Sequence, residues 1–309
     1  MLNIRLVVPP ETAPDVLDYL RNAKEVADIA YLPGASIDPP GDLVFFDVPP
    51  EASSAVLDDL HSRGLPSRAE IVGHHLDLVD SPRAEIAARE APGSAVDAVV
   101  WEEVEDRVGE SAGPSVNFYV LMVLATMIGA IGILTDSIVL IIGAMVVGPE
   151  FGPLAGLCSG IVQKRPDFAT RSLLTLVTGF PFAIVLAALL VVVLRVTGVA
   201  PEQIQPAERS LTRFISHPNA YSVIVALLAG VTGMLAVMRS TAAPLIGVLI
   251  SVTTIPAAAN VGVGLAYGDA NEMLGAAAQL AANLTALTVA GSLTMWTQLG
   301  AYQRRRARR

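Results

Sequence analysis

The residues with the clearest capacity for chemistry lie inside a long apolar run, at residues 148–153, which read GPEFGP. A carboxylate near the centre of a membrane helix costs about 2.5–3.5 kcal/mol, so Glu150 is a functional candidate by default. Prolines remove helical hydrogen bonds and glycines permit close backbone approach, which frees N–H and C=O groups to bind a small solute or ion. The predicted ligands in this segment are Gly148, Pro149, Glu150, Gly152 and Pro153.

A second polar interruption lies 104 residues further on, where residues 253–256 read TTIP inside the apolar stretch 242–267. Thr254 lies 104 residues after Glu150, so the two positions correspond to each other. Asn260, Gln279 and Asn283 follow along the chain and are weaker candidates, because a single amide in an apolar helix is more often an interhelical contact than a ligand. The predicted second half of the site comprises Thr253, Thr254, Pro256, Asn260 and Asn283.

Two roles are possible for the Glu150 carboxyl, and two paths through the membrane are possible for the segment around it. The carboxyl either exchanges a proton or binds a cation during transport, or it is a structural group that caps the helix that follows the break. Residues 137–163 either cross the membrane as a broken span or form a re-entrant hairpin. The hairpin would place Lys164 and Arg165 outside the cell instead of in the cytoplasm.

The composition predicts a membrane protein with a water-soluble part. Hydrophobic residues make up 53% of the 309 residues and charged residues only 16%, which indicates several membrane spans. We predict an α-helical polytopic fold with six spans, of which the second and the fifth are broken: 117–135, 137–163, 171–197, 221–238, 242–267 and 273–302.

The spans occur twice in the same order: unbroken, broken and long. Membrane repeat 1 is predicted at 117–197 and membrane repeat 2 at 221–303, joined by an interfacial linker at 198–220 that contains a short helix at 207–215. An odd number of spans per repeat inserts the two repeats in opposite orientations. A 3+3 inverted repeat with paired broken helices is typical of secondary transporters, whose site lies where the breaks meet.

Charge is divided unevenly between the two parts. Residues 1–116 hold 8 Lys/Arg and 22 Asp/Glu, net −14, whereas residues 117–309 hold 12 and 7, net +5. The acidic part argues against a nucleic-acid partner. With the N-terminal part in the cytoplasm, nine Lys/Arg flank the spans on that side, counting the basic tail 304–309, and three lie outside. This bias predicts cytoplasmic N- and C-termini.

The acidic part is predicted to contain a domain and a connector. Residues 1–80 show the order β-α-β-β-α-β of an α+β ferredoxin-like domain, a fold that hosts many functions. Residues 81–116 are predicted as a helical acidic connector in which Trp101, Val104 and Val108 lie on one side and pack against a partner surface.

No nucleotide-binding loop and no nucleophile–base pair is visible, so we predict neither an enzyme nor a cofactor. We predict no metal site; the single cysteine, Cys158, excludes a disulfide within one chain. The expected activity is ion- or proton-coupled secondary transport of an unidentified small solute or ion, with a cytoplasmic regulatory domain and a homo-oligomeric, dimeric, assembly in the lipid bilayer. An ion channel and a membrane-embedded sensor or scaffold are the alternatives.

Residues 117–156 resemble the bacterial membrane family named domain of unknown function 389. The resemblance rests on LATMI at 124–128, GILTDS at 132–137 and IIGAM at 141–145, followed by the proline-rich turn. Residues 245–268 resemble the second conserved segment of the family, and the whole resemblance covers about 115–300. It implies that the two interrupted spans form one core and that the protein is located in a bacterial inner (plasma) membrane. Many members have Ser-Pro-Leu where this chain has Gly-Pro-Glu, so the resemblance assigns no role to Glu150.

Overall fold

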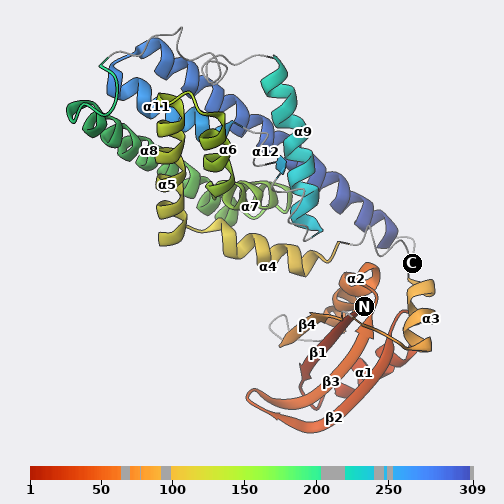
Figure 1. Cartoon of the computed structure of the whole chain (residues 1–309). Helices are drawn as coiled ribbons and strands as arrows, with labels where there is room; N and C mark the ends of the chain where they lie inside the picture. Colours follow the sequence, from red (N-terminus) through yellow and green to blue (C-terminus); the bar gives the residue numbers. More distant parts are fainter. Residues whose placement is uncertain are drawn as a thin grey trace. The chain divides into compact units, whose positions relative to one another are not determined.

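The computed structural model describes residues 1–63, 70–76, 78–91, 99–202, 220–239, 247–248 and 253–306. The chain is mostly helical with a small N-terminal sheet (Figure 1). It forms two compact units, one comprising Met1–Val104 with the chain end from Gln303, the other Glu105–Tyr302. The predicted domain limits at residues 80 and 116 stay predictions.

The first unit begins with the predicted order β-α-β-β-α-β. Its strands pair in the order β2-β3-β1-β4, and every pairing is antiparallel, which is the split β-α-β arrangement of a ferredoxin-like domain. The elements are β1 (Leu2–Val8), α1 (Ala13–Asn22), β2 (Ala27–Ile37), β3 (Pro40–Val48), α2 (Pro50–Ser62) and β4 (Ile71–His75).

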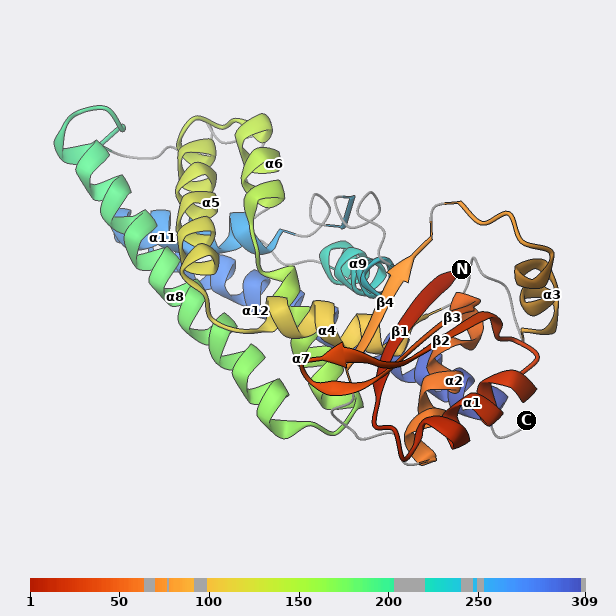
Figure 2. The ribbon, with the colours of Figure 1, turned by 90° about the horizontal axis from the view of Figure 1, so that it is seen from below.

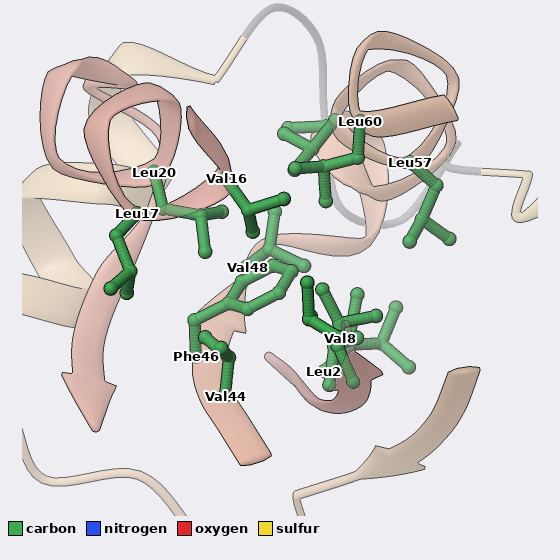
Figure 3. Packing of buried hydrophobic residues seen from close by; sticks show 14 of the residues in the cluster. Leu2, Val8, Val16, Leu17, Leu20, Val44, Phe46, Val48, Leu57 and Leu60 are labelled. Carbon is green, nitrogen blue, oxygen red and sulfur yellow. The ribbon is translucent and has the colours of Figure 1, made fainter. Parts of the chain in front are cut away.

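The core of this unit lies between the two helices and one face of the sheet. Alternate residues of a strand point to the same face, so Leu2, Ile4 and Leu6 of β1 are all buried there. Figure 3 shows Val16, Leu17 and Leu20 of α1 and Leu57 and Leu60 of α2 above Phe46 of the sheet. The amphipathic face predicted for each helix is therefore the face that packs.

Asp42 holds the long β2–β3 hairpin together. Its Oδ2 accepts a hydrogen bond of 2.6 Å from Tyr31 Oη, and its Oδ1 accepts one of 2.7 Å from the Gly34 amide. Gly34 has φ +62°, which favours glycine. The Tyr31 hydroxyl, and then the Gly34 amide, lower the pKa of Asp42, while the same bond to Asp42 raises the pKa of Tyr31.

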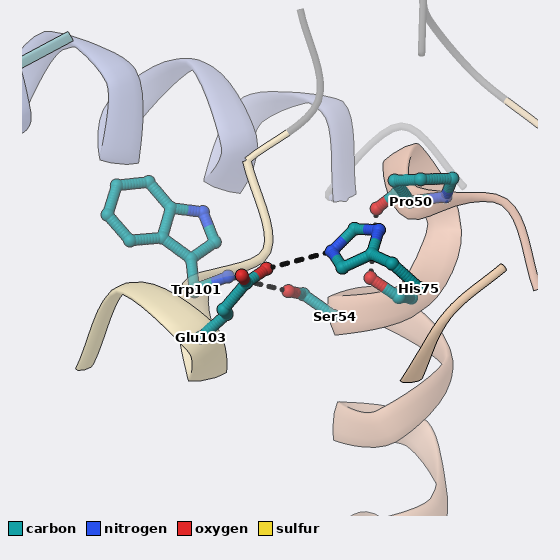
Figure 4. A network of polar contacts seen from close by, with 6 residues as sticks. Pro50, Ser54, His75, Trp101 and Glu103 are labelled. Carbon is teal, nitrogen blue, oxygen red and sulfur yellow. Dashed lines mark hydrogen bonds and ion pairs between the residues drawn. The ribbon is translucent and has the colours of Figure 1, made fainter. Parts of the chain in front are cut away.

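Two helices follow the sheet, α3 (Pro82–Glu90) and α4 (Trp101–Ala112). α3 contacts β2 and β3. At the start of α4, the Trp101 amide donates to Ser54 Oγ at 3.1 Å, and His75 Nε2 lies 3.2 Å from Glu103 Oε2 (Figure 4). The predicted stripe of Trp101, Val104 and Val108 is buried, at 7%, 1% and 2% exposure, which confirms that this side of the helix packs.

The second unit contains the apolar helices. Four of them, α5, α8, α9 and α12, are long and apolar enough to cross a membrane, and α6 with α7, bent by 50°, makes up to five. The predicted span 242–267 and the predicted linker 198–220 lie partly outside the described residues. The predicted linker helix at 207–215 and the last three residues of the tail lie wholly outside them. The helices are α5 (Val116–Leu134), α6 (Ile138–Val147), α7 (Phe151–Val162), α8 (Pro166–Val196), α9 (Ala220–Met238), α11 (Thr254–Tyr267) and α12 (Ala270–Arg306).

α5, α6, α8 and α11 share one apolar core, and α5 and α6 lie side by side (Figures 1 and 2). Small residues let these helices approach closely. A Cβ on Gly129 of α5 would lie only 3.0 Å from Ala259 Cβ of α11. This packing brings the start of α11 against the break between α6 and α7.

Candidate functional site

The first break is shorter than predicted. α6 ends at Val147 and α7 begins at Phe151, so only residues 148–150 lie outside helix. Gly148 is extended, with φ −60° and ψ 128°, because the residue before a proline avoids helical geometry.

Four residues predicted to belong to the breaks are helical instead. Gly152 and Pro153 lie in the first turn of α7, and Thr254 and Pro256 lie in the first turn of α11. The N–H groups of a first helical turn have no partner in their own helix, so a proline there loses nothing. The prediction that these residues form open backbone was wrong.

Glu150 lies in the break and is buried, at 4% exposure. Its Oε1 accepts a hydrogen bond of 2.6 Å from Thr254 Oγ1, which confirms that the two positions aligned by the 104-residue spacing lie together. Its Oε2 is buried and has no hydrogen-bond partner in the structure. A Cβ on Gly148 would overlap this oxygen and lie 2.6 Å from Ile255 Cγ1, so only glycine leaves room for the carboxyl.

The contacts of Glu150 bear on the capping interpretation. Glu150 is the residue before α7, yet its side chain makes no hydrogen bond to the amides of that helix. Capping requires such a bond. The carboxyl reaches the start of α11 instead, so it joins two interrupted helices rather than ending one.

A second set of polar side chains adjoins Thr254 through its neighbour Thr253. Asn283 Nδ2 donates to Thr253 Oγ1 at 3.0 Å, and Gln279 Nε2 donates to Asn283 Oδ1 at 3.0 Å. Gln279 is 1% exposed and its Oε1 has no hydrogen-bond partner in the structure. Gln279 was outside the predicted site. The available signal was its position one helical turn before Asn283, on the same face of α12.

Asn260 belongs to a different neighbourhood. It is buried in α11, six residues beyond Thr254, and its Nδ2 donates to Glu272 Oε1 in the first turn of α12 at 3.0 Å. This hydrogen bond joins α11 to α12 close to the turn between them. The structure therefore brings Glu150, Thr253, Thr254 and Asn283 into one polar cluster and ties Asn260 elsewhere.

A cavity of about 480 Å³ lies among α7, α8 and α12, apart from this polar cluster. Leucine, valine and phenylalanine side chains make up most of its lining. Two threonines also line it, Thr285 and Thr288, and their hydroxyls donate to carbonyl oxygens of their own helix. The cavity contains none of the predicted site residues. It offers apolar contact rather than polar recognition, so the polar cluster is the candidate site.

Comparison with known proteins finds a family match in the apolar part of the chain. The model of the family named domain of unknown function (DUF389) matches residues 145–289. The match begins at the last residue of the IIGAM motif and includes the second conserved segment, whereas LATMI and GILTDS precede it. An uncharacterised protein of Methanocaldococcus jannaschii is 25% identical over 191 residues, which are 62% of this chain and 57% of the relative.

The chain thus spans less than two thirds of the length of that relative. No solved structure matches this chain. The matched range includes Glu150 and Thr254, one from each interrupted segment. Over residues 145–289 the chain therefore matches the model of the DUF389 family, the family whose resemblance the sequence motifs indicated.

Proposed function

We propose that the protein is a secondary transporter whose site lies where the break before α7 meets the start of α11, with coupling to a proton or a small ion at Glu150. The observation that carries the proposal is the buried 2.6 Å hydrogen bond between Glu150 and Thr254. A carboxyl buried among apolar helices is costly, and interrupted helices that face each other are typical of transporter sites.

Helix bounds support a repeat of 104 residues. α5 spans 116–134 and α9 spans 220–238, so both ends differ by this number. α8 begins at 166 and α12 begins at 270, again 104 apart. The common spacing supports the proposal that the chain contains two copies of one helical unit.

The turns that precede α8 and α12 support the same repeat. In the first, the Arg165 amide donates to the Gly160 carbonyl at 2.9 Å, and in the second the Asp269 amide donates to the Gly264 carbonyl at 3.0 Å. The residue before each of these amides has a positive φ, 56° at 164 and 71° at 268. Each of these positions in the second turn is 104 residues beyond its counterpart in the first.

Contacts between the two copies are reciprocal. Gly129 of α5 faces Ile255 of α11, while Gly233 of α9 faces Phe151 of α7, and both pairs exchange under the 104-residue spacing. Such reciprocity is what a two-fold relation between two copies produces. Glu150 and Thr254 are counterparts that touch each other, so they belong close to the two-fold axis.

The proposal includes the finer features predicted from sequence. These are six spans with residues 242–267 as the second broken one, opposite orientations of the two repeats, cytoplasmic termini in a plasma membrane, and a homo-oligomer. The N-terminal domain has a regulatory role, and the protein has no enzymatic activity. The reciprocal contacts support the repeat, and the uneven distribution of Lys/Arg supports the orientation.

The test is proton flux in proteoliposomes that contain the full chain and a pH-sensitive dye. We expect the wild type to move protons when members of a panel of small solutes are added, and Glu150→Gln to fold normally without this flux. Asp167→Asn, in the first turn of α8, is the control and should behave as the wild type. Equal flux in Glu150→Gln and the wild type would refute the coupling role. Stepwise currents in planar bilayers would favour a channel, and the absence of any flux would favour a sensor or scaffold.

A further inference from the structure

The direction of each hydrogen bond in the polar cluster shows which atoms are left for a ligand. Gln279 donates to Asn283, and Asn283 donates to Thr253. In a separate hydrogen bond, the hydroxyl of the neighbouring residue Thr254 donates to Glu150 Oε1. The buried side-chain atoms of this cluster that have no partner are Glu150 Oε2 and Gln279 Oε1.

Both unpartnered atoms are hydrogen-bond acceptors. A buried acceptor without a partner carries a desolvation cost that a donor or a cation removes, whereas an anion would add repulsion. Gln279 and Asn283 each donate an N–H within the cluster, so the atoms left wholly without a partner are both oxygens. The site is therefore matched to a positively charged ligand.

The number of charges limits the ligand further. Among the buried polar and charged residues that the structure describes in the second unit, Glu150 is the single carboxyl, and the others in the cluster are neutral. One carboxylate balances one positive charge, whereas a divalent ion would keep a net charge in a low-dielectric site. Both unpartnered atoms of this cluster are oxygens, and oxygen ligands suit hard cations rather than soft metals.

Resting on the proposed function, we propose that the coupling ion is a monovalent metal cation, with Na⁺ as the test ion. Glu150 binds it in the charged form through Oε2. Gln279 supplies a neutral carbonyl oxygen from the adjoining set of hydrogen-bonded side chains, either directly or through the water molecules that the ion retains. Gln279 is then a binding residue, whereas Asn283 is a positioning residue that holds the Gln279 amide.

Equilibrium binding of radioactive Na⁺ to the purified full chain in detergent tests this proposal, with choline as the reference cation. We expect saturable binding by the wild type that unlabelled Li⁺ or Na⁺ displaces. Glu150→Gln should weaken binding by at least about tenfold, and Gln279→Leu by roughly threefold to tenfold. Thr285→Ala, whose hydroxyl is bonded within its own helix, is the matched control on α12 and should bind as the wild type.

A second variant keeps the test decisive should Glu150→Gln fail to fold. Gln279→Glu adds a carboxylate beside the proposed ion and should tighten Na⁺ binding or admit Ca²⁺, and unchanged binding in both Gln279 variants would contradict the role of Gln279. Absence of saturable Na⁺ binding by the wild type would overturn the cation proposal. If Glu150-dependent proton flux persisted in that case, the proposed transporter would stand as a proton-coupled one. Na⁺ binding that depends on Glu150 without any transport would support the site and refute the transporter.

Discussion

Gly148 and Glu150 share one small space in the break before α7. A Cβ at residue 148 would overlap Glu150 Oε2 and press on Ile255. We expect Gly148→Ala to lower the free energy of unfolding by about 1–3 kcal/mol, because a side chain forced into a filled site strains its neighbours. Unfolding in mixed detergent measures this change.

Gly143 provides the control for that substitution, because a Cβ at this position in α6 meets open space. Gly143→Ala should leave stability within about 0.5 kcal/mol or raise it by up to about 1 kcal/mol, since alanine favours helix. An equal loss of stability in both variants would show that the overlap at residue 148 has no special effect.

Asp42 gives the soluble domain a pH-dependent contact. Its pKa is lowered in the folded protein, chiefly by the Tyr31 hydroxyl and then by the Gly34 amide. A lowered carboxyl pKa contributes stability that is present above the ordinary value of 3.8 and is lost as the pH falls through the lower folded value. We expect Asp42→Asn to speed amide hydrogen exchange in residues 27–48 at pH 7.

The difference between Asp42→Asn and the wild type should narrow as the pH falls below 3.8, because protonation then removes the same carboxylate from the wild type. Asp38→Asn in the same hairpin is the control. A difference that stays constant down to pH 2 would indicate that the substitution acts through shape rather than charge.

Sequence alone located Glu150 and its counterpart Thr254, because a carboxylate in an apolar run is costly and the repeat spacing pairs the two positions. Gln279 was only a weak signal in sequence. Many amides in apolar helices contact a neighbouring helix, and Gln279 differs from them only in having a buried oxygen without a partner. That property depends on the positions of neighbouring side chains, which periodicity does not predict.

At the scale of elements, the end of α4 is fixed to α7 and α8. Ala112 is fully buried, its carbonyl accepts a 3.2 Å hydrogen bond from Thr175 Oγ1, and its Cβ fills the space that a side chain at Gly156 would need. The same helix α7 begins beside Glu150. A displacement of the end of α4 would therefore act on the helix that follows the break.

Thr175→Val should loosen the end of α4, because it removes the hydroxyl that the carbonyls of Ala112 and Arg171 share while keeping the shape of the side chain. We expect a loss of about 1 kcal/mol, seen as faster hydrogen exchange in residues 105–113, with Gly156→Leu having a larger effect. Thr285→Val, on α12, is the control. Unchanged exchange in the Thr175 and Gly156 variants would show that α4 is held by other contacts.

Helix positions followed closely from apolar length, whereas the limits of the breaks did not. The span predicted at 117–135 is α5 at 116–134, and the span predicted at 221–238 is α9 at 220–238. The break predicted at 148–153 ends at residue 150, because Pro153 is compatible with the first turn of a helix. A proline indicates that a helix end is near, but the sequence does not show whether the proline lies inside the helix or outside it.

At the scale of the whole membrane part, the repeat makes a prediction about sidedness. If α6 with α7 crosses the bilayer as one bent span, each repeat has three crossings and the two repeats point in opposite directions. If the pair is re-entrant in both repeats, each repeat has two crossings and they point the same way. Pro166 and Ala270 are matched reporters, because both are exposed and each is the first residue of its helix, 104 positions apart.

Single cysteines at these two positions, in a Cys158→Ala background, distinguish the arrangements in intact cells. Cys158 is buried, so its removal leaves the labelled surface unchanged. For the inverted repeat we expect an impermeant maleimide to label Ala270→Cys from outside, and Pro166→Cys only after the membrane is opened. Labelling of both from the same side would refute the inversion and favour the re-entrant arrangement. It would also separate the polar cluster from the inverted-repeat mechanism, since Glu150 and Thr254 would then meet at the tips of two parallel hairpins rather than at the centre of two opposed spans.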